Sequence, residues 1–427
     1  MTKKYTFQEF YALSVLPFLW LLIVIPSSLL ASVKIFLLLA VTLFFGLHHY
    51  SRRTVFSYRA VIWLAAVVLF LCLQLLRGFI ETDYGISGPL KSLSSIMLVI
   101  FITAIVTLSL RSRMLSYSSL VKTICSAIGL YCLAKLLLFI LCIAGILEPR
   151  TVLPMLDGLM PGIVFQIFLG DSNLFRLVTS TDMVVCYFTC LALVLGRPEF
   201  SISSGKWNLV VVLGVINSVQ SMTRFIWIVL ALTFLYKLLS SPRYSGVTIL
   251  IICLTILVGP FLLANYAPYL EIYNTRSFDI YSLTVKFIQS SKLLDYIAGS
   301  PLIGYGAGAY IPGYIRSVEL PFQYENQWFA LGLQYGLVFV ACLWIFIAYR
   351  LSQSVAVSTI RRLFVVMLFC LFFLSGFTNP NLTILNSALI YILMENFENL
   401  FASPSDEGKW PQDRRHSLAS MSHGGAK

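Results

Sequence analysis

Arg224 lies between two long apolar runs, in the short segment Ser221-Met-Thr-Arg224. If both runs cross a membrane, this segment is the tip of a tight hairpin, where a cation is costly unless an anion accompanies it. The guanidinium of arginine is always charged, and its planar fork suits phosphate and carboxylate groups. The position therefore predicts that Arg224 binds either an anionic substrate or the phosphate headgroups of the bilayer.

The long segment 265–326 holds a second set of polar side chains. It contains Arg276 near its start and Arg316 near its end, and it closes with Tyr324-Glu-Asn326 before another apolar run. Apolar residues between 279 and 297 recur at a spacing that predicts an amphipathic helix on the outer surface of the membrane. These residues are Ile280, Leu283, Phe287, Leu294 and Ile297.

Glycines follow that helix at positions 304, 306 and 308. They permit a tight backbone with positive φ. The run does not follow a strand and open a helix, so it is not a dinucleotide-binding fingerprint.

Lys135 is a candidate of another kind, because it lies inside an apolar run. It is either a functional residue or the partner of another group within the helix bundle. All nine cysteines also fall inside apolar runs. A disulfide framework or a CxxC metal site is therefore not expected.

The elements that carry these residues are transmembrane helices. The chain is 59% hydrophobic and 11% charged, and apolar runs near the length of a bilayer crossing recur throughout it, which predicts about twelve spans. We place them at residues 11–28, 33–48, 60–76, 91–110, 121–146, 180–196, 207–220, 225–240, 247–264, 327–349, 363–379 and 384–400.

Basic clusters orient these spans. The positive-inside rule places both termini in the cytoplasm, with inward clusters at Lys3-Lys4, Arg52-Arg53, Arg111/Arg113, Arg361-Arg362 and Arg414-Arg415. The net charge of +12 is thus mainly a signal of topology, and nucleic acid is not an expected partner. Polar segments at 77–91, 148–181 and 265–326 face outward. We expect one transmembrane domain at residues 1–401 and a disordered cytoplasmic tail at 402–427.

The Ser/Thr-Arg hairpin tip, Arg276, the sequence Pro301-Leu-Ile-Gly-Tyr-Gly306 and the loop end at Asn326 together resemble the O-antigen polymerase and ligase superfamily. The resemblance covers roughly residues 207–345. It implies a GT-C-like, all-α fold with a large periplasmic loop, at about 265–326, before helix 10. It also implies a multi-pass protein of the bacterial inner membrane that builds surface polysaccharide.

That family implies inverting glycosyl transfer from a polyprenyl-pyrophosphate-linked glycan, with no cofactor and no metal. Arginines would hold the departing pyrophosphate, and a general base would help to deprotonate the acceptor hydroxyl. Catalytic roles fall to Arg224, Arg276 and Glu325. Substrate-binding roles fall to Arg77, Arg176, Arg316, Tyr324 and Asn326, although anchoring at headgroups is the simpler reading of Arg77, Arg176 or Arg316 taken singly.

Glu325 stands where the ligase branch of the family has a catalytic histidine. All four histidines lie on the cytoplasmic side of our topology, at His48, His49, His416 and His423. The sequence therefore favours a polymerase over a ligase. Glu325 would act as a base, position the acceptor sugar, or form a salt bridge to a neighbouring arginine. Tyr324 and Asn326 would contact sugar or begin the next helix.

Two alternatives remain: an O-antigen ligase with the same fold, and a flippase or other transporter of lipid-linked oligosaccharide. A flippase should show repeat symmetry and charges deep in several spans, whereas Lys135 is the one such charge that the sequence indicates. The lipid bilayer and the lipid-linked glycan are expected partners, and family resemblance adds a chain-length regulator.

Overall fold

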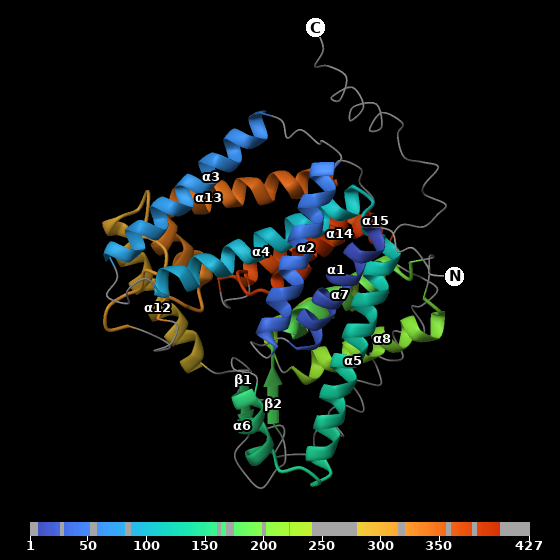
Figure 1. Cartoon of the computed structure of the whole chain (residues 1–427). Helices are drawn as coiled ribbons and strands as arrows, with labels where there is room; N and C mark the ends of the chain where they lie inside the picture. The colour runs from blue at the N-terminus through green and yellow to red at the C-terminus, as the bar shows by residue number, and fades with distance from the viewer. Residues whose placement is uncertain are drawn as a thin grey trace.

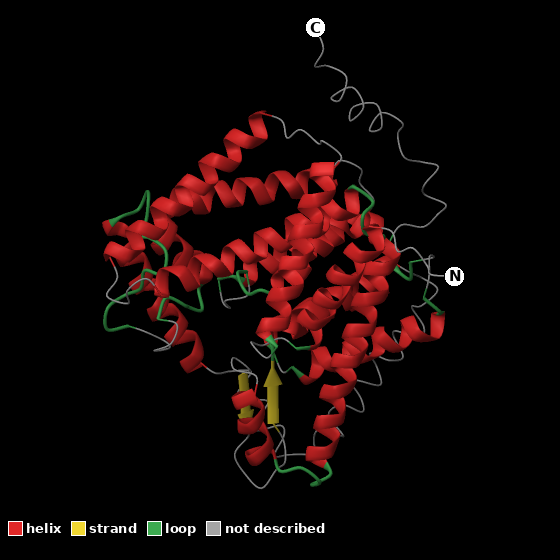
Figure 2. Ribbon diagram, in the orientation of Figure 1, coloured by secondary structure: helices red, strands yellow, loops and turns green. Residues whose placement is uncertain are grey.

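The computed structural model describes residues 7–25, 30–51, 58–81, 87–159, 164–167, 175–198, 202–221, 223–240, 280–314, 321–355, 360–377 and 382–401. Within these ranges the chain is a bundle of helices with one small sheet (Figures 1 and 2). The expected ninth span at 247–264, residues Arg276 and Arg316, and the tail at 402–427 lie outside the described residues.

Helices occupy eleven of the twelve ranges expected to be spans, all eleven within the described part of the chain. They are α1 (Phe7–Val24), α2 (Ala31–Ser51), α3 (Tyr58–Glu81), α4 (Ser87–Arg111), α5 (Tyr117–Ile143), α7 (Ser180–Leu195), α8 (Ser204–Gln220), α9 (Arg224–Ser240), α13 (Gln327–Val355), α14 (Ile360–Ser375) and α15 (Ser387–Leu400).

Three of these helices are long and apolar enough to cross a bilayer: α4, α5 and the Gln327–Tyr349 part of α13. Shorter apolar stretches occur in α1, α2, α7, α14 and α15. One face of α2 exposes Ile35, Phe36, Leu39 and Leu43, and a continuous apolar face of this kind needs lipid rather than water around it. The protein is therefore an α-helical membrane protein, and the count of twelve spans stays a prediction.

Helix ends that the charge pattern assigns to the same side of the membrane contact one another. The Thr181 hydroxyl, at the start of α7, donates to the Ile23 carbonyl at the end of α1, at 2.9 Å. At the opposite ends of α4 and α15, Arg111 and Glu395 form an ion pair at 3.4 Å. The packing of the bundle is thus compatible with the alternating topology drawn from the sequence.

The expected all-α fold class is confirmed, and the segment at 148–181 adds one small sheet to it. This segment forms a short helix, α6 (Pro149–Leu159), and a two-stranded antiparallel sheet of β1 (Val164–Ile167) and β2 (Phe175–Val178). The register pairs Val164 with Val178 and Ile167 with Phe175. Phe175 and Leu177 pack with Cys142 of α5, so the hairpin is anchored to the end of that helix.

Helix α12 (Ile280–Gly299) confirms the helix expected at 279–297. Gln289, Leu293 and Ile297 are buried at a spacing of four residues, and α12 packs against α13. Phe287 and Leu294, which belonged to the expected apolar face, are 76% and 47% exposed. The helix therefore packs one stripe against α13 and leaves Phe287 and Leu294 outside, and its place on the membrane surface stays a prediction.

Candidate functional site

The glycine turn, residues 304–308, has the conformation that its glycines predict. Gly304, Gly306 and Gly308 have φ angles of +67°, +98° and +74°. A Cβ atom on Gly306 would lie 2.1 Å from the backbone nitrogen of Gly78, and one on Gly308 would lie 2.7 Å from that of Pro89. Both the backbone angle and the space available therefore require glycine, which lets the turn approach the ends of α3 and α4.

The same turn fills a break in α13. Gly336 has φ 84° and ψ 160°, which interrupts the helix, so nearby carbonyls lose the donors that a continuous helix would supply. The carbonyl of Leu333 instead accepts from the Tyr305 N–H at 2.8 Å, and that of Gln334 accepts from the Gly306 N–H at 2.9 Å. These bonds satisfy backbone carbonyls that would find no hydrogen-bond donor in lipid.

Arg77 is the predicted arginine that the structure brings to this turn. Its guanidinium donates to the hydroxyl of Ser300 at 3.2 Å. One turn earlier on α3, the side-chain amide of Gln74 donates to the Ile303 carbonyl at 3.1 Å, and the backbone carbonyl of Gln74 accepts from the Ala307 N–H at 2.9 Å. Arg77 is therefore held at the edge of a rigid loop by a hydroxyl that leaves most of its donors for other groups.

Tyr324 is part of the interior of the loop. It is buried, its hydroxyl accepts from the Ile311 N–H at 2.7 Å, and it donates to the Tyr314 carbonyl at 3.3 Å. Burial raises the pKa of Tyr324 to about 12, against the opposing effect of the hydrogen bond from Ile311. The side chain predicted to contact sugar is thus engaged mainly in holding the loop together.

Asn326 begins α13. Its side-chain oxygen accepts from the Phe329 N–H at 3.2 Å, the usual bond of an N-cap residue, and its amide donates to Ser290 of α12 at 3.1 Å. The amide oxygen of Gln289 accepts from the N–H groups of Glu325 and Asn326 at 2.9 and 3.3 Å. Helix α12 therefore fixes the point at which the loop returns to the bundle, which matches the helix-starting alternative for Asn326.

Glu325 forms an ion pair with Lys286 of α12, at 3.3 Å between Oε2 and Nζ. Their side chains are 24% and 29% exposed, although Oε2 of Glu325 itself is buried. The sequence suggested an arginine as the partner in this role, and the structure supplies a lysine. A half-buried carboxylate beside one cation is chemically able to accept a proton or a sugar hydroxyl.

A cavity of about 380 Å³ adjoins the loop end. It lies between the first turns of α4, the segment 322–324, the first two turns of α13 and the segment 383–385. Tyr324 contributes to its wall. The cavity wall therefore includes Tyr324 and Gln327, the neighbours in sequence of Glu325 and Asn326.

The other predicted arginines are placed less completely. Arg224 is the first residue of α9 and is exposed. Arg176 pairs with Gln166 across the β-hairpin by its backbone. In the part of the chain that the structure describes, no hydrogen bond or ion pair joins Arg224 to Glu325 or to Arg77, so a shared site for these residues stays a prediction.

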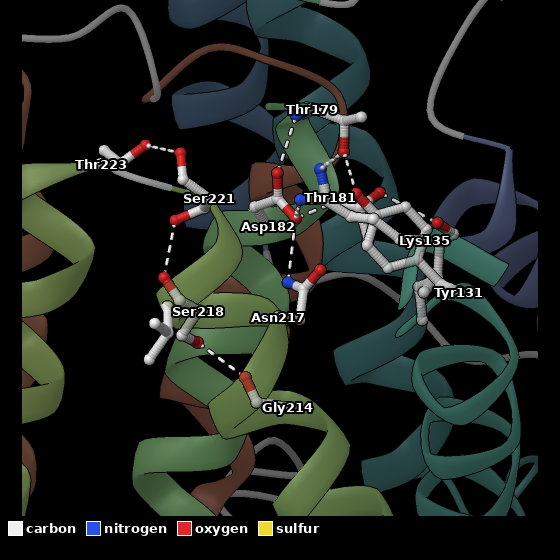
Figure 3. A network of polar contacts seen from close by, with 12 residues as sticks. Tyr131, Lys135, Thr179, Thr181, Asp182, Gly214, Asn217, Ser218, Ser221 and Thr223 are labelled. Carbon is white, nitrogen blue, oxygen red and sulfur yellow. Dashed lines mark hydrogen bonds and ion pairs between the residues drawn. The ribbon is translucent and has the colours of Figure 1, made fainter. Parts of the chain in front are cut away.

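Asp182 is the polar residue that the sequence did not reveal (Figure 3). It is fully buried, and its carboxylate accepts from four groups: the Lys135 ammonium at 2.7 Å, the Tyr131 hydroxyl at 3.0 Å, the Asn217 amide at 2.9 Å and the Thr179 N–H at 2.8 Å. Lys135 is therefore paired within the bundle. The expectation that Lys135 is the one charge inside a span was wrong, because Asp182 of α7 is also buried.

A local signal for Asp182 was present in the sequence. The segment Thr179-Ser-Thr-Asp182 forms a capping box at the start of α7, the pattern in which a Ser or Thr is followed three residues later by an acidic or amide side chain. What the local pattern could not show is that Lys135 and Asn217 converge on the same carboxylate from two other helices.

This network, which consists of Tyr131, Lys135, Thr179, Asp182 and Asn217, reaches the α8–α9 hairpin close to its tip, through Asn217 (Figure 3). Asn217 precedes the end of α8 by less than one turn. There the Ser221 hydroxyl donates to the Ser218 carbonyl at 2.8 Å, and Thr223 donates to the Ser221 carbonyl at 3.2 Å. The buried carboxylate thus ties the α8–α9 hairpin to α5 and α7.

Comparison with protein-family models, curated proteins and solved structures finds no match for this chain. Its function is therefore argued from the loop, the cavity and the charged residues described above.

Proposed function

We propose that the protein is a membrane glycosyltransferase that polymerises polyprenyl-pyrophosphate-linked oligosaccharide repeat units. Its product would be an O-antigen, a capsule or an exopolysaccharide, made at the periplasmic face of the bacterial inner membrane. The observation that carries the proposal is the docked loop. Arg77 and the glycine turn meet it at Ser300, just after the C-terminal end of α12, and Glu325 meets it at Lys286, in the N-terminal half of that helix.

The polar groups of this loop support a reaction on one side of the membrane. They gather at helix ends, where water and a lipid-linked substrate both have access. The buried charges Lys135 and Asp182 neutralise each other at 2.7 Å, and Asp182 lies in the first turn of α7. Such a pair suits a structural role better than the ion pathway of an alternating-access transporter.

In the proposed reaction, an acceptor hydroxyl attacks the anomeric carbon of the donor sugar from the face opposite the pyrophosphate. The bond between that carbon and the pyrophosphate oxygen breaks, and the configuration inverts. Glu325 accepts the hydroxyl proton. Arg224 and Arg276 stabilise the charge on the departing pyrophosphate, and Arg77, Arg176 and Arg316 bind the rest of the donor head.

The topology that completes the proposal has twelve spans, cytoplasmic termini and the loop at about 265–326 outside. A ligase would share this topology, but its usual histidine is replaced by Glu325. A chain-length regulator is the protein partner that we expect. No cofactor enters the reaction, because the pyrophosphate already activates the donor.

The test uses the purified full-length protein in nanodiscs with a polyprenyl-pyrophosphate-linked repeat unit as the sole substrate. We expect a ladder of longer glycans, which Arg224→Ala abolishes and the matched variant Arg197→Ala, at an exposed arginine after α7, retains. A product that forms only when a lipid A-core acceptor is added would identify a ligase. Movement of the lipid across the bilayer without a glycosidic product would refute the proposed glycosyltransferase activity.

A further inference from the structure

We propose that the cavity between α4, α13 and the segment 322–324 is the subsite for the acceptor sugar, and that it selects a sugar carrying a carboxylate. The inference rests on the proposed function, because an acceptor has meaning only for a transferase. It adds the class of the acceptor sugar and names Lys91 as the residue that selects it.

The size of the cavity is the first argument. Its volume of about 380 Å³ lies at the lower end of the usual range of ligand pockets, roughly 300–1,000 Å³. That volume suits one or two sugar rings. The long prenyl chain of a carrier lipid does not need an enclosed pocket, because the bilayer outside already dissolves it.

The chemistry of the wall is the second argument. Hydroxyl and amide side chains from Ser94, Ser95 and Gln323 line the cavity together with the apolar residues Ile96 and Leu331. A sugar ring presents both hydroxyl groups and apolar C–H faces, so it needs a wall with both characters. No carboxylate is among the described residues of the wall.

The wall is also preorganised. The Gln334 amide accepts from the Ser92 hydroxyl at 2.6 Å and donates to the Phe322 carbonyl at 3.3 Å. Gln327 accepts from the Leu382 N–H at 2.6 Å. These bonds connect α4, α13 and the two loop segments, so a ligand would meet fixed groups and would not have to order them, which favours binding.

Lys91 is the charged residue of the wall, as far as the wall is described. It is exposed, and its ammonium forms no ion pair with any residue that the structure describes. A cavity with a cation in its wall and, among the described residues of that wall, no carboxylate attracts an anion. Tyr324, which lines the cavity, is the neighbour in sequence of Glu325, the proposed base.

The binding test measures glucuronate, glucose and inorganic phosphate against the full-length protein in nanodiscs by saturation-transfer NMR titration. We expect glucuronate to bind about two- to fivefold more tightly than glucose, the range of an exposed ion pair. Lys91→Gln should remove that preference, and Lys206→Gln, at an exposed lysine of α8, should keep it. Equal binding of glucose and glucuronate by the native protein would overturn the charge selection.

A second variant tests the location. Ser94 is exposed, and its hydroxyl donates to the Lys91 carbonyl at 3.0 Å. Ser94→Trp should fill the cavity without disturbing the core and abolish binding of both sugars. Ser126 is a matched control on α5, because it is also exposed and donates to the Thr123 carbonyl at 2.9 Å. Ser126→Trp should leave binding unchanged.

The outcomes separate this inference from the proposed function. Sugar binding that Ser94→Trp abolishes, in a protein that forms no ladder, supports the subsite and refutes the polymerase. A ladder that survives Ser94→Trp refutes the subsite and leaves the polymerase standing. Binding of phosphate with no binding of either sugar would show an anion site and overturn the saccharide assignment.

Discussion

At the scale of single residues, Asp182 has the most demanding environment. Its carboxylate is fully buried and depends on the Lys135 ammonium 2.7 Å away. Removing one partner of such a pair leaves a buried charge without compensation, which costs about 3–5 kcal/mol. We therefore expect Asp182→Asn to lower the free energy of unfolding by that amount, measured by denaturant unfolding in detergent.

The control is the surface pair Arg111–Glu395, in which Arg111 is 55% exposed. Glu395→Gln should change the free energy of unfolding by less than about 1 kcal/mol. The double variant Lys135→Met/Asp182→Asn should recover part of the stability lost in Asp182→Asn. Equal effects of Asp182→Asn and Glu395→Gln would contradict the role assigned to the buried pair.

Glu325 has two alternative roles that kinetics will separate. If its carboxylate accepts the acceptor proton, Glu325→Gln should lower the rate of chain extension by roughly 10²- to 10⁴-fold. If it serves only the ion pair with Lys286, Lys286→Gln should be just as harmful. We expect Lys286→Gln to cost less than tenfold in the ladder assay, and equal losses would remove Glu325 from the chemistry.

Because of Tyr324, we expect the free energy of unfolding to decrease as the pH rises in the alkaline range. Its pKa is about 12 in the folded protein and about 10 in an unfolded chain, so the folded state keeps the proton longer. This contribution to stability is complete below pH 10 and is lost as the pH rises towards 12. Tyr324→Phe should be less stable at pH 8, because the Ile311 N–H loses its acceptor, but its unfolding midpoint should fall less steeply between pH 9 and 11.5.

At the scale of elements, the glycine turn and the break in α13 form one joint. An alanine at position 306 would combine a strained positive φ with a Cβ atom 2.1 Å from the Gly78 backbone. We expect Gly306→Ala to lower the free energy of unfolding by about 2–4 kcal/mol. Gly46→Ala, in α2 with nothing within 4 Å of the added atom, should be neutral or stabilise by up to about 1 kcal/mol. Similar effects of the two variants would contradict the requirement for glycine where the turn contacts α3.

The sequence predicts elements well where the pattern is local. Hydropathy indicates helices at eleven described positions, and the spacing of apolar residues indicates α12, because each signal comes from consecutive residues. The hairpin of Val164–Ile167 and Phe175–Val178 was not predicted, since two four-residue strands give too short a pattern. The break at Gly336 was also missed, because a lone glycine in an apolar run gives no sign that a loop residue will approach it.

For the candidate site too, the sequence identified residues that local patterns mark and missed their partners from distant segments. Glu325 and Asn326 were identified because they end a polar segment, and Arg77 because it begins one. The partners Lys286, Gln289 and Ser290 were not, since they lie more than thirty residues away in sequence. A contact between distant segments depends on how the helices pack, which the order of residues does not show directly.

At the scale of the whole molecule, the topology is open to a direct test. Asp295 is an exposed position on α12, and Lys206 is an exposed position at the start of α8. We expect a cysteine introduced at Asp295 to react with an impermeant thiol reagent in intact spheroplasts. A cysteine at Lys206 should react only after permeabilisation. The reverse pattern would invert the assigned orientation and place the loop in the cytoplasm.

The joint between α3 and the glycine turn also bears on how the protein is made. The Gln74 amide on α3 contacts a carbonyl 229 residues further along the chain, so α3 is synthesised and inserted long before its partner exists. Until then, the narrow approach at Gly78 faces lipid or insertion factors. A nascent chain that stalls before residue 300 would therefore expose an incomplete helix surface, and membrane quality control would have a feature by which to detect the unfinished protein.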